Sequence, residues 1–298
     1  MIRDAETRNS LDVKRFSPMP HVSVIIPTYN RHEFVCEAIA SVLAQSFSDF
    51  ELIVVDDGSE DGTADVVREF LGVRYVYQPN RGVSAARNRG VSLSRGELIA
   101  FLDSDDFWQP RKLEHQVKFF TVHPEAQICQ TEEIWLRNGV RVNPHRKHRK
   151  VGGDIFARSL DLCLVSPSAV VMRRALFERM GGFDESLPAC EDYDLWLRVA
   201  AVMPVYLIDT PLVIKRGGHA DQLSRQFWGM DRFRVTALCK LLKSGILSEE
   251  QRQLTVQVLQ RKCTILAHGA RKRGQNGECY RTLAETYAHT YKPEGSCH

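Results

Sequence analysis

The sequence has no apolar run long enough to cross a membrane. Its apolar runs, such as residues 22–27, 52–55 and 169–172, are far shorter than the ~18 residues that a membrane-spanning helix needs. The first residues are polar and contain no apolar core segment, so the sequence predicts no secretory signal. We therefore expect a cytoplasmic protein.

The sequence also has little excess charge of one sign and no paired cysteines. Its 40 basic and 37 acidic residues leave a formal net charge of +3, which is too small for a general nucleic-acid binder. The 8 cysteines are scattered and never form a CxxC pair, so we predict reduced, mostly buried thiols and no zinc site. With 298 residues, of which 43% are hydrophobic, the chain can form one large domain or two medium ones.

What the sequence does contain is a regular alternation of short apolar segments and amphipathic segments. The apolar segments predict strands at residues 22–26, 52–55, 73–77 and 98–102. The amphipathic segments predict helices at residues 34–43, 66–71 and 83–93. This alternation predicts an α/β fold with a mostly parallel central sheet and helices on both faces.

We divide the chain into three parts. Residues 1–20 are polar and show no periodicity, so we predict a flexible leader. Residues 21–225 are predicted to form the α/β domain, whose first half closes near residue 125. Three helical patterns follow and end near Tyr291, so we predict that residues 226–298 form a helical C-terminal extension.

Polar side chains follow three of the predicted strands, at residues 27–30 (PTYN), 56–59 (DDGS) and 103–106 (DSDD). In open α/β sheets, ligands bind where the strands end at their carboxyl edge. Several carboxylates at one strand end repel each other unless a cation neutralises them, so residues 103–106 indicate a Mg²⁺ or Mn²⁺ site that substrate phosphate oxygens complete. The alternative is an acidic turn that caps the next helix.

Two of these positions suit a nucleotide. A carboxylate after the second strand can accept a hydrogen bond from a base N–H or a ribose hydroxyl. Tyr29, after the first strand, can stack on a nucleobase. A common Asp–Gly turn and ordinary aromatic packing are the alternative interpretations.

A third acidic cluster opens a later helix, at residues 191–194 (EDYD). Three acids in four positions exceed what capping a helix requires. A carboxylate there, partly shielded by Tyr193 and Trp196, can serve as a general base. His219 lies between glycines and an alanine and can reach a metal or a phosphate, although a loop histidine is more often simply exposed.

Residues 141–150 hold five basic residues and no acid. We predict a mobile loop there, with a solvated face as the favoured interpretation and an anion-binding lid as the alternative. The five unopposed cations also suggest the hypothesis of peripheral contact with the inner face of the membrane.

Seven motifs follow one another along the chain, at residues 22–30 (VSVIIPTYN), 44–51 (AQSFSDFE), 55–59 (VDDGS), 82–90 (GVSAARNRG), 101–108 (FLDSDDFW), 181–185 (GGFDE) and 191–196 (EDYDLW). In this order and spacing they resemble family 2 glycosyltransferases, and the resemblance spans residues 22 to about 225. The resemblance implies a GT-A fold, a nucleotide-sugar donor that is usually UDP-linked, a Mg²⁺ or Mn²⁺ cofactor and an inverting single displacement. It also implies a carbohydrate or glycolipid acceptor.

The resemblance further implies roles for single residues. It assigns donor binding to Pro27, Thr28, Tyr29, Asp57, Arg87, Asp103 and Ser104. It assigns metal binding to Asp103 and Asp105 of the DxD motif, with His219 as a further ligand. Asp192 matches the catalytic base, and Glu191 and Trp196 fall on the acceptor side. By this assignment, residues 21–125 bind the nucleotide sugar and residues 126–225 bind the acceptor.

Two other functions compete with this one. A phosphoacceptor receiver domain, which is not an enzyme, also pairs two aspartates at one strand end, but here a whole strand and helix precede Asp56. A nucleotidyltransferase of similar fold usually has a glycine-rich loop after its first strand, and residues 27–31 (PTYNR) contain no glycine. The chain also lacks the QxxRW motif of membrane-bound polymerising members. We therefore expect transfer of one or a few sugars, as in surface polysaccharide or glycolipid biosynthesis.

Overall fold

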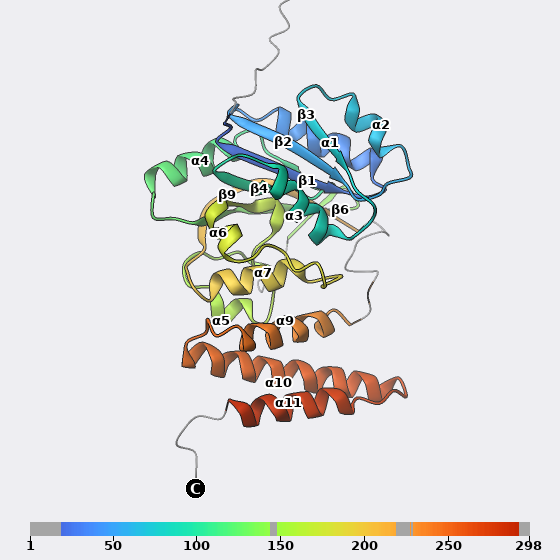
Figure 1. The fold of residues 1–298 in the computed structure, drawn as a ribbon, viewed down its shortest axis with the longest axis vertical. Helices are drawn as coiled ribbons and strands as arrows, with labels where there is room; N and C mark the ends of the chain where they lie inside the picture. Colours follow the sequence, from blue (N-terminus) through green and yellow to red (C-terminus); the bar gives the residue numbers. More distant parts are fainter. Residues whose placement is uncertain (1–18, 144–147, 219–226, 228, 292–298) are drawn as a thin grey trace, which may run out of the picture.

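A computed structural model describes residues 19–143, 148–218, 227 and 229–291 of the chain. Residues 1–18 of the predicted leader and the predicted metal ligand His219 lie outside these residues. Within them, a central sheet carries helices on both faces, and the C-terminal helices stack in successive layers beyond it (Figure 1).

The first half of the chain alternates strands and helices, as the hydrophobic pattern predicts. The strands are β1 (Val22–Thr28), β2 (Phe50–Asp56), β3 (Val73–Tyr77) and β4 (Leu98–Phe101). They pair in parallel in the order β3-β2-β1-β4. The helices between them are α1 (His32–Leu43), α2 (Thr63–Arg68) and α3 (Val83–Leu93). Every residue of β1 and β2 is buried, because helices cover both faces of the sheet at these strands.

The second half continues the same sheet with mixed pairing. Its strands are β5 (Phe107–Trp108), β6 (Ile128–Arg137), β7 (Val140–Val142), β8 (Val170–Arg173) and β9 (Tyr206–Gly217). β8 pairs antiparallel with β4 and β6, whereas β6 and β9 run parallel. The predicted α/β class is confirmed, with its continuous parallel part in β1–β4. The sequence did not reveal β6 and β9, whose register shifts twice between Thr131 and Glu133 and so breaks the alternation of polar and apolar residues.

The remaining helices are α4 (Lys112–Val122), α5 (Phe156–Ser159), the short 3₁₀ helix η2 (Pro167–Ala169), α6 (Arg174–Arg179), α7 (Glu191–Ala200), α9 (Asp231–Lys243), α10 (Glu249–Lys272) and α11 (Glu278–Thr290). The last three lie where the three C-terminal helical patterns were predicted. α10 begins with a capping box, in which the Ser248 side chain accepts from the Gln251 backbone and the Gln251 side chain accepts from the Ser248 backbone.

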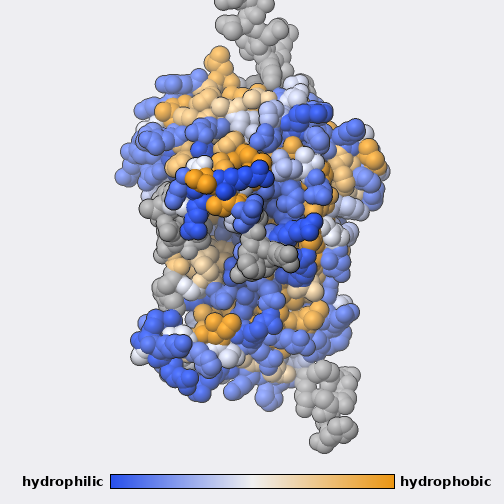
Figure 2. All heavy atoms as spheres, turned by 180° about the vertical axis from the view of Figure 1, so that it is seen from behind, coloured by the Kyte–Doolittle hydropathy of each residue, from blue (hydrophilic) through white to orange (hydrophobic). Residues whose placement is uncertain are grey.

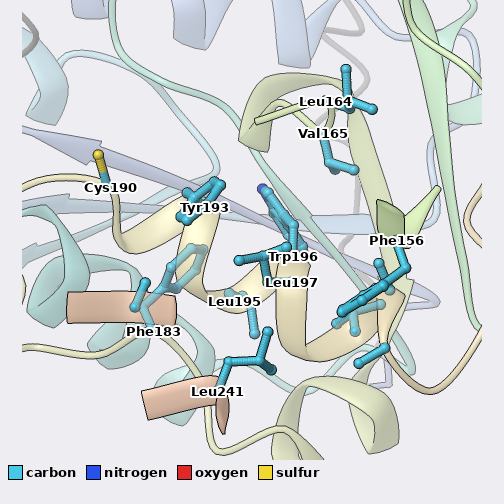
Figure 3. Packing of buried hydrophobic residues seen from close by; sticks show 14 of the residues in the cluster. Phe156, Leu164, Val165, Phe183, Cys190, Tyr193, Leu195, Trp196, Leu197 and Leu241 are labelled. Carbon is cyan, nitrogen blue, oxygen red and sulfur yellow. The ribbon is translucent and has the colours of Figure 1, made fainter. Parts of the chain in front are cut away.

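Two apolar clusters hold the layers together. One cluster joins one face of the sheet to α1 and α4, and the other joins the opposite face to α3, α6, α7, α9 and α10. In the second cluster, the side chains of Tyr193 and Trp196 point from α7 into the packing between the layers (Figure 3). The first turn of α7 is therefore held rigidly against the sheet.

On the face shown in Figure 2 hydrophilic residues predominate, and the hydrophobic residues form separate patches. No helix among the described residues has the length and apolar character that a bilayer crossing requires. The cysteines within the described residues are all free thiols, and of these only Cys279 is exposed. Cys129, Cys190 and Cys263 are buried and three others are partly exposed, so fewer of these cysteines are buried than the sequence predicted.

The prediction of one mobile basic loop over residues 141–150 is wrong for its described ends. Arg141 lies in β7, paired with β6. The Lys150 side chain is buried, with its Nζ 3.3 Å from Glu133 Oε1, and it donates to Gln130 Oε1 at 2.9 Å. Lys150 is therefore not one of five unopposed cations, because its partner acid lies in a strand that the local sequence does not reveal.

Lys112 in α4 is a buried cation without an acidic partner among its hydrogen bonds to described residues. Its Nζ donates to Gln116 Oε1 at 2.7 Å and lies 3.8 Å from the centre of the Trp108 ring. Burial lowers the pKa of Lys112 from 10.5 to about 7. The folded chain therefore releases this proton more readily than the unfolded chain does.

We expect Lys112→Met to raise the free energy of unfolding by about 1–3 kcal/mol at pH 7, because a methionine of similar volume removes the desolvation cost. Between the folded pKa of about 7 and the unfolded value of 10.5, the unfolded wild type binds more protons, so its stability rises with pH. The difference in free energy of unfolding between Lys112→Met and the wild type should therefore be smaller at pH 9.5 than at pH 7. Urea unfolding of both proteins at the two pH values measures this difference, and an advantage that grows with pH would contradict the account.

Candidate active site

The loops after β1 and β2 form one wall of the site. The Asn30 backbone N–H donates to Ser59 Oγ at 2.8 Å, and the Glu60 N–H donates to Asn30 Oδ1 at 2.8 Å. These bonds hold Asn30 at a positive φ of 49°, which asparagine tolerates better than most residues. Tyr29 beside it is 47% exposed, so its ring is accessible to a ligand.

Asp57 sits at the base of this wall, next to the buried Pro27 and Thr28 of β1. Its Oδ1 accepts from Gln78 Nε2 at 2.7 Å and from the Arg81 N–H at 2.9 Å, and its Oδ2 accepts from the Gly82 N–H at 2.8 Å. A carboxylate has about four acceptor positions. The three internal bonds hold the loop that leads into α3. About one acceptor position is left on a residue that is itself 4% exposed, so a ligand can reach Asp57 only at its open edge.

Arg87 on α3 joins acids from the two halves of the chain. Its Nη2 donates to Asp103 Oδ1 and its Nη1 donates to Glu191 Oε1, both at 2.7 Å. The Arg87 side chain is only 4% exposed. Burial alone would lower its pKa, but the charges of Asp103 and Glu191 outweigh burial and raise it. The resemblance assigned Arg87 to the donor side, near the sugar or diphosphate, and that assignment stays a prediction. In the structure the guanidinium is bound to Asp103 and Glu191, so it positions both carboxylates.

Asp103 and Asp106 share a hydroxyl partner. The Asp103 N–H donates to Ser168 Oγ at 3.1 Å, and Ser168 Oγ donates to Asp106 Oδ2 at 2.7 Å. Burial alone would raise the pKa of Asp103, but the charges of Arg87 and Lys215 lower it, so its carboxylate stays ionised. Asp106 is almost fully buried, and burial holds its pKa well above the usual range. The nearby Ser104, which the resemblance assigned to donor binding, is also buried.

Asp105 faces the wall formed by the first loop. Its Oδ2 lies 2.6 Å from Arg31 Nη1, and both side chains are less than one-fifth exposed. Arg31 directly precedes α1 and follows Asn30, so this ion pair ties the wall at Tyr29 to the DxD motif.

The carboxylates of Asp103 and Asp105 offer the hard oxygen ligands that Mg²⁺ and Mn²⁺ prefer. Within the described part of the chain, no three or more His, Cys, Asp or Glu residues converge on one metal position. Mg²⁺ is commonly held by one or two carboxylates and completed by substrate phosphates. The two aspartates fit that donor set, and the predicted ligand His219 lies outside the described residues.

The three acids in the first turn of α7 have different surroundings. Glu191 is bound to Arg87, and Asp194 is bound to Arg198 at 2.7 Å and to Lys240 at 2.9 Å. Both Glu191 and Asp194 are buried, whereas Asp192 is partly exposed. Asp192 is thus the only one of the three that has no ion-pair partner among the residues described.

Asp192 is nevertheless held in place. Its Oδ1 accepts from the Tyr193 N–H at 2.7 Å, and its Oδ2 accepts from the thiol of Cys163 at 3.5 Å. Burial and the Asp192 charge hold the pKa of Cys163 well above its usual range, so the thiol keeps its proton and stays a donor. The carboxylate is therefore oriented without being neutralised.

Two residues predicted on the acceptor side have other roles in the structure. Trp196 is 1% exposed and packs edge-on against Phe183, with ring centres 6.1 Å apart, so it is a core residue rather than an acceptor contact. Figure 3 shows its ring among the buried side chains of α7. Glu191 is buried against Arg87, and burial together with Asp192 raises its pKa. Glu191 is buried by Arg87 and Trp196 packs against Phe183, and both partners lie outside the acidic motif, so the motif alone does not reveal the burial of either residue.

Sequence reasoning missed Lys215 on β9. Its Nζ donates to Ser166 Oγ at 3.1 Å. Burial alone would lower its pKa, but four acids outweigh burial and raise it, namely Glu133, Asp106, Asp103 and Asp192. The available signal was a single lysine at the end of an apolar run, residues 212–214 (LVI), where a buried acid must balance it.

Comparisons with known proteins cover most of the residues that form this site. The model described as "Glycosyl transferase family 2" matches residues 23–181, which is more than half of the chain. An uncharacterized glycosyltransferase from Rickettsia typhi is 34% identical over 216 residues, which cover 70% of this chain and 68% of that protein. A relative from Rickettsia conorii is 32% identical, but the match spans only 38% of its length.

A relative of stated activity comes from Escherichia coli. It is named UDP-Glc:alpha-D-GlcNAc-diphosphoundecaprenol beta-1,3-glucosyltransferase and is 33% identical over 181 residues, which cover 60% of this chain and 69% of the relative.

Among solved structures, residues 1–349 of S. aureus TarS in complex with UDP-GlcNAc match with a TM-score of 0.69 and 22% identity, over 82% of this chain and 72% of that TarS chain. A mannosyltransferase from Pyrobaculum calidifontis in complex with GDP-Man and Mn²⁺ matches with a TM-score of 0.58 and 20% identity, over 91% and 84% of the two chains. At these identities the likeness concerns the fold, and it confirms the predicted GT-A fold.

We expect Arg87→Ala to lower the free energy of unfolding by about 3–5 kcal/mol, because it leaves the carboxylates of Asp103 and Glu191 without their buried cation. Arg81→Ala is the matched control. Arg81 precedes the same helix and pairs with Glu185 at 2.8 Å, but its side chain is 65% exposed, so its loss should cost at most about 1 kcal/mol. Urea unfolding at pH 7.5 measures both, and equal losses would contradict the role given to Arg87.

Proposed function

This chain belongs to glycosyltransferase family 2, and from that premise we propose that it is a metal-dependent, inverting enzyme. It moves one sugar from a UDP-linked donor to a hydroxyl of a carbohydrate or glycolipid acceptor. Membership of this family excludes the receiver domain and the nucleotidyltransferase that the sequence alone left open.

The observation that carries the mechanism is the difference among the acids of α7. Glu191 and Asp194 are buried and bound to cations, whereas Asp192 is partly exposed and has no ion-pair partner among the described residues. A general base needs an accessible, ionised carboxylate that can accept a proton. We assign this role to Asp192, which the Cys163 thiol and the Tyr193 N–H orient.

In the proposed reaction, the acid of α7 accepts a proton and the acids after β4 hold a cation. An acceptor hydroxyl gives its proton to Asp192 as its oxygen attacks the anomeric carbon, and the bond to the nucleoside diphosphate breaks on the opposite face. Attack from the face opposite the leaving group inverts the anomeric configuration. A divalent cation held by Asp105 and Asp103 would offset the negative charge that develops on the departing diphosphate.

The wall formed by the loops after β1 and β2 suits a nucleobase. The exposed ring of Tyr29 offers a stacking surface, and the remaining acceptor position of Asp57 can take a base N–H. Uracil carries one such N–H between two carbonyl groups, so it fits one ring and one acceptor. The UDP-sugar in the name of the E. coli relative and the UDP-GlcNAc in the TarS complex support this choice of nucleotide.

We propose a saccharide acceptor, either free or attached to a lipid diphosphate. The E. coli relative is named for a GlcNAc-diphosphoundecaprenol acceptor, which supports the lipid-linked form. This assignment places the enzyme in surface polysaccharide or glycolipid biosynthesis. A lipid-linked acceptor would bring it to the inner face of the membrane.

The direct test is a panel of UDP- and GDP-sugars with Mn²⁺, in which release of the nucleoside diphosphate and the anomeric configuration of the product are measured. We expect turnover with a UDP-sugar, an inverted product and loss of turnover in EDTA. Asp192→Asn should lower kcat by about 10²–10⁴, because it removes the general base. Asp105→Asn should weaken the dependence on Mn²⁺ and lower turnover.

Asp65→Asn is the matched control, because Asp65 lies on α2 with an 85% exposed side chain and should leave turnover unchanged. Full activity of Asp192→Asn or a product of retained configuration would refute the proposed mechanism.

A further inference from the structure

Arg31 holds the carboxylate that the proposed function assigns to the metal. Its Nη1 lies 2.6 Å from Asp105 Oδ2, with the two side chains 15% and 17% exposed. A short contact between a guanidinium and a carboxylate is a strong, charge-assisted interaction. In the structure, the negative charge of Asp105 is therefore already matched by a cation from the chain itself.

A divalent cation cannot join Asp105 without affecting this pair. Two cations that share one carboxylate repel each other, and the shielded position of Asp105 strengthens that repulsion. Arg31 contacts Oδ2 of Asp105, so a cation at this carboxylate would weaken the contact with the guanidinium and favour its release. Arg31 and a divalent cation thus compete for Asp105 in the free protein.

Arg31 has an anchored backbone and open space on one side. The Arg31 N–H donates to Thr63 Oγ1 at 3.4 Å, and the preceding Asn30 is bound to Ser59. A cavity of about 530 Å³ lies beside Arg31, and acids at Glu33, Glu60 and Asp61 are among the residues that line it. The backbone position of Arg31 is therefore fixed next to an open part of the surface.

Arg31 lies between two groups that would hold the two ends of a donor nucleotide. Tyr29, two residues earlier, offers the surface for the base, and Asp105 is the candidate ligand of the cation. The diphosphate of a nucleotide sugar connects these two positions. Arginine suits this location, because its planar guanidinium can bind a phosphate through two parallel hydrogen bonds.

We propose that Arg31 is a diphosphate-binding residue that neutralises Asp105 in the free enzyme and transfers to the donor when a divalent cation takes Asp105. The inference rests on the proposed function and extends it. Exchange of partners makes the two ligands cooperative, because the diphosphate provides a new partner for the guanidinium that the cation displaces. By linkage, the cation and the diphosphate must strengthen each other's binding by the same factor.

The test measures binding rather than turnover. Mn²⁺ affinity is determined by electron paramagnetic resonance with and without UDP, and UDP affinity by calorimetry with and without Mn²⁺, for the wild type, Arg31→Gln and Arg31→Lys. Without UDP, Arg31→Gln should bind Mn²⁺ about 3–10-fold more tightly, because the competing cation is gone. With Mn²⁺ present, it should bind UDP at least about tenfold more weakly. Arg31→Lys keeps the charge, so its affinities for Mn²⁺ and UDP should lie between those of the wild type and those of Arg31→Gln.

Arg111→Gln is the matched control, because Arg111 also directly precedes a helix but pairs with Glu114 on the surface. It should bind both ligands as the wild type does. Circular dichroism of each variant shows whether it is folded, and the gain in Mn²⁺ affinity is a result that misfolding would not produce.

The outcomes separate this inference from the proposed function. If the wild type binds Mn²⁺ and UDP cooperatively and turns over donor, but Arg31→Gln binds both ligands equally well, the role of Arg31 is wrong and the proposed function stands. Weaker Mn²⁺ binding by Arg31→Gln in the absence of UDP would also overturn the exchange. If the wild type binds no Mn²⁺ even with UDP, both the metal dependence and the exchange are refuted.

Discussion

The buried guanidinium of Arg87 allows carboxylates from two halves of the chain to share one site. Asp103 ends the β4 segment and Glu191 opens α7, and each accepts one hydrogen bond of 2.7 Å from Arg87. Without a cation between them, the partly exposed Asp103 and the buried Glu191 would repel each other, and Glu191 would also bear the cost of desolvation. The position of α7 against the sheet, and with it the position of Asp192, depends on this bridge.

The other charges of the site follow the same rule. Asp105 is matched by Arg31, Asp194 by Arg198 and Lys240, and Glu133 by Lys150. The charge of Lys215 acts on four acids, of which Glu133 and Asp103 also have the partners named above. Against this background, the partly exposed Asp192 stands out, because its described contacts are to a thiol and to a backbone N–H. A dense set of paired charges thus leaves one oriented carboxylate for proton transfer.

The sequence predicted the acids but not their partners. The strands β1–β4 are continuous apolar runs that end in polar residues, so local pattern located the strands and the carboxylates that follow them. Arg31, Arg87 and Lys215 act on acids that are distant in the sequence, and no local pattern encodes such pairs. The same limit explains the errors at Lys150 and Trp196, whose surroundings come from β6 and from the packing of α7. His219 lies outside the described residues, and its role stays a prediction.

The central claim is that the acids after β4 and the acid of α7 act on opposite sides of one donor sugar. A crystal structure of the chain with Mn²⁺ and a non-hydrolysable UDP-sugar tests it directly, because anomalous scattering locates the manganese. The account predicts a manganese peak bound by Asp105 and by the diphosphate, with the Asp192 carboxylate across the anomeric carbon from the leaving group. A manganese peak away from Asp105, or Asp192 on the same side as the diphosphate, would contradict it.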